Sequence, residues 1–267
     1  MRLRDTPGPS GEVSSRDKVD TSFMHENLND CQPIVKGGVR GVERTGNNRS
    51  PHMRMILLAA PKGGVGKSTV ASSLLAAARH AGLRAAGLDL DPQLSLVWWA
   101  EQRQQRGLEP TAEVMAEALR RWDEAIERMV GFDLLVIDTP PGAPEAGLQA
   151  LLDAARNASL VLVPAKASEP SVRPLVGFGE LLARTGVPVR YILNEVSAPA
   201  LARDARAILA PTGLLADVEI PARADFARLY ALGAAAADAP KVSGAGTFAK
   251  LWRYVVAQVG LTAELAA

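Results

Sequence analysis

Residues 61–69 read Pro-Lys-Gly-Gly-Val-Gly-Lys-Ser-Thr and directly follow the apolar run 53–60. The glycines leave backbone N–H groups free to point at phosphate oxygens, and the helix expected next offers its positive N-terminus to the same anion. In the common pattern Gly-x-x-x-x-Gly-Lys-Ser/Thr, Lys67 reaches the β- and γ-phosphates and the Ser68 hydroxyl ligates Mg²⁺. A strand that runs into such a loop predicts an α/β fold that binds a nucleotide.

The loop departs from the common pattern at its start, where Pro61 replaces the first glycine and Lys62 adds a second lysine. Lys-Gly-Gly-x-Gly-Lys-Ser/Thr resembles the deviant Walker A motif of the ParA/MinD family of ATPases. The resemblance implies ATP and Mg²⁺ as cofactors and a homodimer with two ATP molecules at its interface. It makes Lys62, which would cross to the partner's nucleotide, and Lys67 catalytic. The nucleotide-binding residues that it implies here are Gly63, Gly64, Val65, Gly66, Lys67, Ser68 and Thr69.

Composition excludes several other classes of protein. The chain has 267 residues, a formal net charge of +1, 48% hydrophobic residues and 22% charged residues, which is ordinary for a globular domain. Its single cysteine, Cys31, excludes a disulfide framework and an intrachain thiolate metal cluster. No apolar stretch approaches the roughly 20 residues of a membrane helix. We therefore expect a cytoplasmic protein without stable membrane insertion, and the resemblance to the ParA/MinD family implies that it is nucleoid-associated.

The first 52 residues differ from the rest. Residues 1–52 mix basic and acidic side chains with Gly, Pro, Ser and Asn and contain few large apolar residues, so they cannot bury enough surface to fold alone. We expect a disordered extension here, and one hypothesis is that translation begins at Met53 or Met55. The ATPase domain is then expected to span residues 53–267.

From residue 54 onward, strand and helix patterns alternate, as in a parallel sheet covered on both faces. The expected fold is α/β, a doubly wound and mostly parallel sheet with helices on both faces. Strands are expected at 54–60, 84–90, 133–138, 159–164, 188–193 and 216–220. Helices are expected at 66–81, 94–106, 112–130, 144–156, 172–185, 200–210, 223–232 and 245–259.

Two acidic segments follow expected strands, at the sheet edge where doubly wound folds bind ligands. Asp89-Leu-Asp-Pro-Gln93 resembles the first switch of the family, which makes Asp91 the residue that positions the attacking water and Asp89 an organiser of the magnesium site. A simple helix cap by Asp91 is the alternative. Asp138, after 132–137, resembles the Walker B aspartate that holds Mg²⁺ through water, and 140–142 resembles the second switch.

The base contacts are predicted partly by exclusion. A GTPase of this architecture would show Asn-Lys-x-Asp, whereas this chain has Asn-Glu-Val-Ser at 194–197. Asn194 matches the adenine-contacting position of the family, and 220–223, with Pro221, resembles the segment that closes the adenine pocket. An asparagine at a strand end can also be only a turn former.

The resemblance implies plasmid or chromosome partitioning, with non-specific DNA and a ParB-like protein as partners. Because the chain is nearly neutral, DNA binding requires a local basic patch. Candidates for it are Arg223, Arg228 and Arg253, although ordinary solvated arginines explain the sequence equally well. Two rivals remain open: a positioning ATPase of the same fold with a protein complex or membrane as cargo, and a biosynthetic P-loop enzyme that activates a small molecule with ATP.

Overall fold

The computed structural model describes residues 53–142 and 145–261, all within one compact unit. The predicted extension 1–52 lies outside the described residues. In the described part of the chain, seven strands form one sheet with the order β3-β2-β4-β1-β5-β6-β7. Their bounds are β1 Arg54–Leu58, β2 Ala85–Asp89, β3 Glu113–Ala116, β4 Leu134–Asp138, β5 Leu160–Lys166, β6 Val189–Val196 and β7 Leu215–Pro221.

Every paired strand is parallel to its neighbours, so the carboxyl ends of the strands meet at one edge. β1 lies between β4 and β5, which places the loop that follows it near the middle of this edge. Asp89 and Asp138 end β2 and β4 and are register partners. The register therefore brings the two predicted acidic residues side by side.

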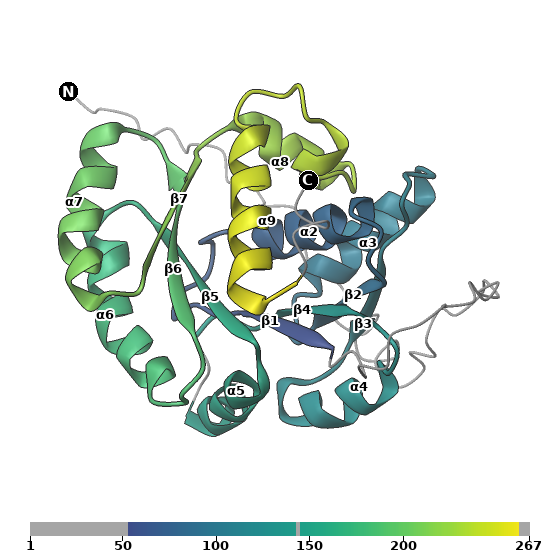
Figure 1. Ribbon diagram of the computed structural model, residues 1–267, viewed down its shortest axis with the longest axis horizontal. Helices are drawn as coiled ribbons and strands as arrows, with labels where there is room; N and C mark the ends of the chain where they lie inside the picture. Colours follow the sequence, from purple (N-terminus) through teal and green to yellow (C-terminus); the bar gives the residue numbers. More distant parts are fainter. Residues whose placement is uncertain (1–52, 143–144, 262–267) are drawn as a thin grey trace, which may run out of the picture. The chain divides into compact units, whose positions relative to one another are not determined.

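Helices cover both faces of the sheet (Figure 1). One apolar cluster, which includes Ile56 and Leu58, packs the sheet against four helices, and the other, which includes Leu57, packs its opposite face against the remaining four. The first layer contains α2 Lys67–His80, α3 Ser95–Gln105, α8 Ala224–Ala231 and α9 Ala245–Val259. The second contains α4 Trp122–Arg128, α5 Glu145–Asn157, α6 Glu169–Ala183 and α7 Pro199–Leu209. The expected doubly wound α/β fold is confirmed.

The helix expected at 112–130 is wrong. Glu113–Ala116 forms β3, which pairs with β2, and only Trp122–Arg128 is α-helical, after a 3₁₀ turn at Leu119–Arg121. The stretch is rich in Ala, Glu, Met and Leu, all good helix formers, but hydrogen bonds to β2 along the open edge of the sheet outweigh that local preference. Among the described residues, no helix is long and apolar enough to cross a membrane.

Candidate functional site

The loop between β1 and α2 turns sharply at its glycines. Gly64 and Gly66 have φ angles of 69° and 87°, in the left-handed region that favours glycine, and α2 begins directly afterwards at Lys67. A Cβ atom on Gly66 would lie 2.2 Å from the Nδ2 atom of Asn194. The loop therefore requires glycine at Gly66 for both its backbone conformation and its contact with β6.

Asn194 is hydrogen-bonded to the phosphate loop. Its side chain is buried, and Nδ2 donates a hydrogen bond of 2.7 Å to the carbonyl oxygen of Val65. The residue thus ties the end of β6 to the phosphate loop. Its expected contact with adenine stays a prediction, as does that of Pro221, which ends β7 and is half-buried.

Asp138, at the end of β4, is a buried acidic residue of the site. It is fully buried, and neither carboxylate oxygen has a hydrogen-bond partner among the described residues. Burial raises its pKa to about 7, and the carboxylate of Asp89 adds to this, whereas the neighbouring Ser68 hydroxyl and Lys67 ammonium lower it. Ser68 lies near enough to influence the carboxyl without meeting hydrogen-bond geometry. A buried carboxylate without a partner, next to a hydroxyl, fits a bound cation.

The donor set suits Mg²⁺ held together with a phosphate. In the described part of the chain, no group of three or more His, Cys, Asp or Glu side chains could hold a metal ion alone. Mg²⁺ commonly takes one or two protein oxygens and completes its shell with water and substrate phosphates. Ser68 and Asp138, beside the phosphate loop, match that chemistry.

Asp89 holds the start of α3. Its Oδ2 atom accepts hydrogen bonds from the backbone N–H groups of Leu96 (2.8 Å) and Val97 (3.1 Å), and Oδ1 accepts one from Asp91 N (3.1 Å). Burial raises the pKa of Asp89 to about 6, although these three backbone N–H groups lower it. Its visible role is to organise the switch segment, and an indirect effect on the magnesium site stays a prediction.

Asp91 lies in the turn that joins β2 to α3. The side chain is largely buried, and its Oδ1 atom accepts a hydrogen bond of 3.0 Å from Gln93 N. Leu94, at the end of the turn, has a φ angle of 52°, which is uncommon and costly for a residue with a branched side chain. The turn that carries the predicted water-positioning residue is therefore under backbone strain.

The second switch segment packs against the start of the phosphate loop. Gly142 N donates a hydrogen bond of 3.1 Å to Ala60 O, and a Cβ atom on Gly142 would lie 2.8 Å from Pro61 O. Thr139 adds a buried hydrogen bond of 2.8 Å to Leu58 O. The segment after β4 is thus in direct contact with the segment after β1.

Lys62 is exposed, in contrast to the buried Lys67. Its Nζ atom donates a hydrogen bond of 3.0 Å to the carbonyl oxygen of Pro170, near the start of α6. An accessible ammonium group at the rim of the site is available to a second molecule. Its role across a dimer interface stays a prediction.

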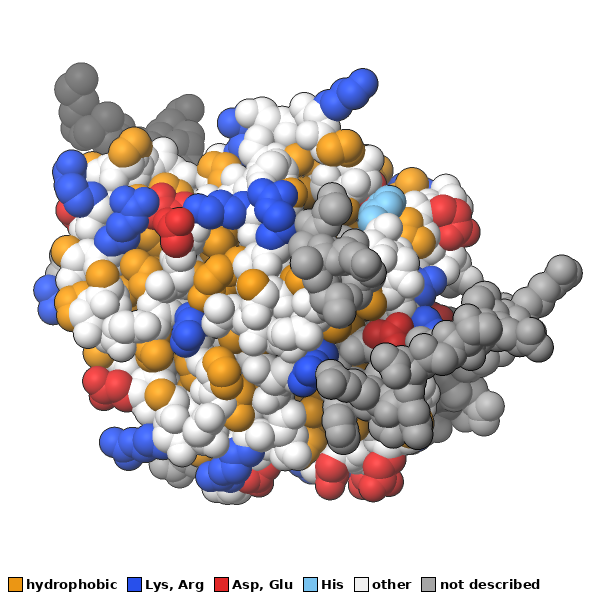
Figure 2. All heavy atoms as spheres, in the orientation of Figure 1, with side chains coloured by type: hydrophobic (Ala, Val, Ile, Leu, Met, Phe, Trp, Pro, Cys, Tyr) orange, Lys and Arg blue, Asp and Glu red, His pale blue; other side chains and the backbone are white. Residues whose placement is uncertain are grey.

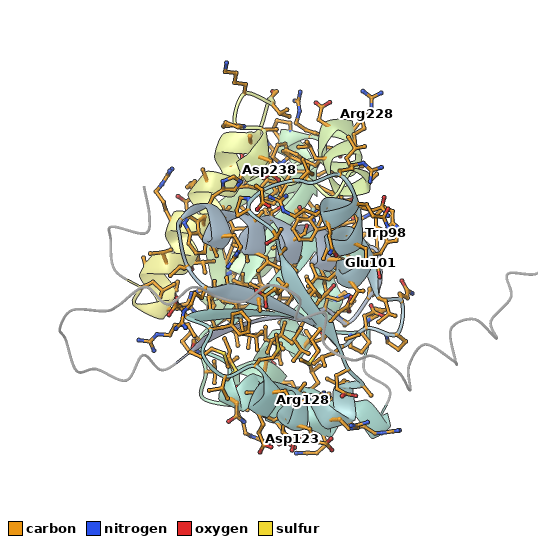
Figure 3. All side chains as sticks on the ribbon, turned by 90° about the vertical axis from the view of Figure 1, so that its right-hand side faces the viewer. Trp98, Glu101, Asp123, Arg128, Arg228 and Asp238 are labelled. Carbon is orange, nitrogen blue, oxygen red and sulfur yellow. The ribbon has the colours of Figure 1, made fainter. Side chains whose placement is uncertain are left out.

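Two clusters that sequence reasoning missed hold α3 in place. Tyr230 of α8 donates a hydrogen bond of 2.6 Å to Ser95 O at the first residue of α3. At the other end, the fully buried Arg103 makes two hydrogen bonds to the carboxylate of Asp238, at 2.7 and 2.9 Å. Figure 3 shows Asp238 above the sheet, in the layer that contains α8. No local motif signals either contact.

The three candidate DNA-binding arginines are exposed, but their environments differ. Arg223 lies 3.9 Å from a carboxylate oxygen of Asp225, whereas the described residues give Arg228 and Arg253 no ion pair. Arg228 projects outward from α8 in Figure 3. Other basic groups gather across the upper part of the face in Figure 2, with acidic ones among them. The ion pairs on α7 and α9 join Arg203 to Asp204, Arg206 to Glu219 and Lys250 to Asp217.

Comparison with known proteins identifies a family for this chain. Residues 56–235 match the family model described as "CobQ/CobB/MinD/ParA nucleotide binding domain". Over 117 residues the chain is 38% identical to the maintenance of carboxysome distribution protein A of Gloeobacter kilaueensis. The match covers 43% of this chain and 52% of that relative, so the chain spans about half the length of the curated relative it matches.

Solved structures share the fold. A putative plasmid partition protein of Borrelia burgdorferi bound to AMPPNP has a TM-score of 0.60 and 17% identity, over 76% of this chain and 100% of that one. The septum site-determining protein MinD of Pyrococcus horikoshii with Mg-ADP has a TM-score of 0.59 and 20% identity, over 76% and 96%. A Cyanothece McdA variant in complex with ATP has a TM-score of 0.60 and 17% identity, over 79% and 98%. With the family model covering most of the chain and the phosphate loop in place, this protein belongs to the CobQ/CobB/MinD/ParA family of nucleotide-binding domains.

Proposed function

We propose that this protein is a Mg²⁺-dependent ATPase of the ParA/MinD type that dimerises with ATP and positions a cargo inside the cell. The observation that carries the proposal is the phosphate loop with Lys67, Ser68 and the unpartnered buried carboxylate of Asp138 at its base. The family assignment and the solved relatives with ATP, AMPPNP or Mg-ADP support the choice of cofactor.

The residues of the site have separate tasks. Backbone N–H groups of 63–69 surround the phosphates, and Lys67 neutralises the β- and γ-phosphate charge. Ser68 and, through water, Asp138 hold Mg²⁺, which when bound offsets the charge on the phosphate oxygens. Asp91 orients the attacking water. Because phosphoryl transfer depends on positioning and charge stabilisation, Asp91 does not need to be a strong base.

Dimerisation supplies the second lysine. Lys62 is exposed, and its hydrogen bond to the carbonyl oxygen of Pro170 is one that the nucleotide of a partner molecule can replace at small cost. ATP binding then favours the dimer, and hydrolysis returns the protein to monomers. An activator bound to the cargo can therefore stimulate hydrolysis and release the protein from its binding surface near that cargo.

Light scattering with and without ATP tests this cycle. We expect wild-type protein to double in mass with ATP, and Lys62→Ala to bind a fluorescent ATP analogue yet stay monomeric. Lys67→Ala should lose nucleotide binding, and Asp91→Ala should dimerise but not turn over. Lys250→Ala, a surface lysine paired with Asp217, is the matched control and should behave as wild type. A dimer formed by Lys62→Ala would refute its role in trans.

Non-specific DNA serves as the surface on which the dimer is held, and a ParB-like protein stimulates its release. The exposed arginines without an ion pair among the described residues, Arg228 and Arg253, are the best supported DNA contacts, ahead of Arg223. Each phosphate contact contributes roughly −0.9 to the slope of log K against log salt. We therefore expect Arg228→Ala and Arg253→Ala each to flatten that slope by about one unit, alike for unrelated DNA sequences.

The cargo distinguishes two versions of this function, partitioning of a plasmid or chromosome and positioning of a protein complex. The 38% identical segment shared with a carboxysome distribution protein favours a protein complex. Isolation of the ATP-bound Asp91→Ala dimer with its partners from the native cell tests the choice. A DNA-binding protein that recognises short repeated sites would support partitioning, whereas an adaptor of a protein assembly would support the second version.

A further inference from the structure

Tyr230 links α8 to the start of α3. It lies in the last turn of α8, and its hydroxyl donates a hydrogen bond of 2.6 Å to Ser95 O. Its ring packs against Trp98 with 5.9 Å between ring centroids. Figure 3 shows Trp98 on the same side of the molecule as Arg228 of α8. Both the hydroxyl and the ring of Tyr230 therefore contact the first turn of α3.

The residue held by Tyr230 ends the turn that carries Asp91. Leu94 N donates a hydrogen bond of 2.9 Å to Asp91 O, and Ser95 follows Leu94 directly. Leu94 is held in the left-handed region, which persists only where surrounding contacts fix both ends of a turn. Asp89 fixes one end by accepting the Asp91 N–H, and Tyr230 fixes the other.

Tyr230 also lines a small cavity together with Thr69, Ser72 and Ser73 of α2, the helix that follows the phosphate loop. Burial raises the pKa of its hydroxyl, the carboxylates of Asp138 and Asp89 raise it further, and the Ser68 hydroxyl lowers it. Tyr230 thus contacts the first residue of α3 and lies beside the helix that begins at Lys67.

We propose that Tyr230 is a positioning residue for ATP hydrolysis, whose hydroxyl holds the Asp91 turn in register with the phosphate loop. The inference rests on the proposed ATPase function, and it adds a residue that lies well outside the switch motifs. Tyr230 touches neither the nucleotide nor the attacking water in this role. Its hydroxyl acts through Ser95 and Leu94 on Asp91.

Tyr230→Phe isolates the hydroxyl, because the ring and its packing against Trp98 remain. Its matched control is Tyr254→Phe, which removes the hydroxyl of a half-buried tyrosine on α9 that, in the described structure, makes no hydrogen bond to α3. Three quantities are measured for each variant: kcat for ATP, affinity for a fluorescent ATP analogue, and backbone hydrogen exchange in the nucleotide-free protein. Thermal unfolding checks that each variant is folded.

We expect Tyr230→Phe to lower kcat roughly fivefold, as for the loss of one neutral hydrogen bond, with analogue affinity within about twofold of wild type. Hydrogen exchange should rise by a similar factor in residues 93–97 and stay unchanged in α2. Tyr254→Phe should match wild type in all three measurements.

Unchanged kcat or unchanged exchange at 93–97 in Tyr230→Phe would overturn the proposal. So would a parallel loss of kcat, affinity and thermal stability, since that pattern belongs to a residue that only supports the fold. If wild-type protein itself does not hydrolyse ATP, both the proposed ATPase function and the role of Tyr230 are refuted. Turnover by wild type together with full turnover by Tyr230→Phe removes only the role of Tyr230.

Discussion

Replacement of Asp138 by Asn should make the nucleotide-free protein more stable at pH 8 while removing its response to Mg²⁺. Asp138 is fully buried with both carboxylate oxygens unpartnered among the described residues, so its ionised form is costly in the absence of a cation. Asparagine has nearly the same shape and no charge. The variant therefore removes the energetic cost of the buried charge while the packing of β4 stays nearly the same.

The size of the effect comes from the pKa shift and the new amide. Burial and the nearby carboxylate raise the pKa from 3.8 to about 7. At about 1.36 kcal/mol per pH unit, ionisation of Asp138 in the folded protein costs about 4 kcal/mol of stability at pH 8. An amide without hydrogen-bond partners costs about 1–3 kcal/mol in return. We therefore expect a net gain of about 1–3 kcal/mol in the free energy of unfolding.

The gain should depend on pH with a definite sign. The folded protein keeps the proton on Asp138 up to about pH 7, whereas the unfolded chain releases it near pH 3.8. The contribution of this group to stability is therefore fully present below about pH 4 and is lost as the pH rises to about 7. Asp89, with a pKa of about 6, adds a second loss in the same interval.

Urea unfolding from pH 4 to pH 8, without nucleotide and with a chelator, measures this effect. Asp138→Asn should exceed wild type at pH 8 and approach it at pH 4. Asp89→Asn is the comparison variant and should gain less than Asp138→Asn, because an amide cannot accept all three backbone N–H groups that Asp89 accepts. In the presence of ATP, added Mg²⁺ should stabilise wild type further but should not stabilise Asp138→Asn. A lower free energy of unfolding for Asp138→Asn at pH 8 would refute the view that its charge is unmatched.

Three further substitutions test the packing around the site. Gly66→Ala should abolish binding of a fluorescent ATP analogue, because its Cβ would meet Asn194 at 2.2 Å; retained affinity would contradict this. Gly233→Ala should lower the free energy of unfolding by about 3 kcal/mol or more, since its Cβ would lie 2.1 Å from the backbone nitrogen of Arg103 and φ is 69°. Asp238→Ala should cost about 3–5 kcal/mol in urea unfolding by leaving the Arg103 guanidinium buried without its carboxylate, and a smaller cost would show that water or another group replaces it.

Most of the sheet could be predicted because its strands carry their own signal. Each of β1, β4 and β5 contains at least three consecutive buried apolar residues, and each is followed by loop residues at the carboxyl edge. The phosphate loop is local as well, because glycine is required within a few residues of a lysine and a serine. Such features depend on neighbours in sequence, so a single sequence is enough to reveal them.

The remainder depends on partners far along the chain. β3 forms a strand because it pairs with β2 at the edge of the sheet, although its residues prefer a helix. Tyr230 and Asp238 each contact α3 across 135 residues, so neither appears special in the sequence. The two adjacent tryptophans also separate only in three dimensions: Trp99 is buried and donates to Ala234 O, whereas Trp98 is 42% exposed.

The contacts of α3 limit how the switch can move. The C-terminal half of the helix is fixed by the Arg103–Asp238 pair, which costs about 3–5 kcal/mol to break. Its first turn is fixed by Asp89 and Tyr230, and the turn 91–94 that precedes it carries the backbone strain at Leu94. A nucleotide that contacts Asp91 can relieve or increase the strain at Leu94 without moving the helix. We therefore expect ATP to change hydrogen exchange in residues 91–94 and to leave residues 100–105 unchanged, and exchange that changes along all of α3 would show that the helix moves as a unit.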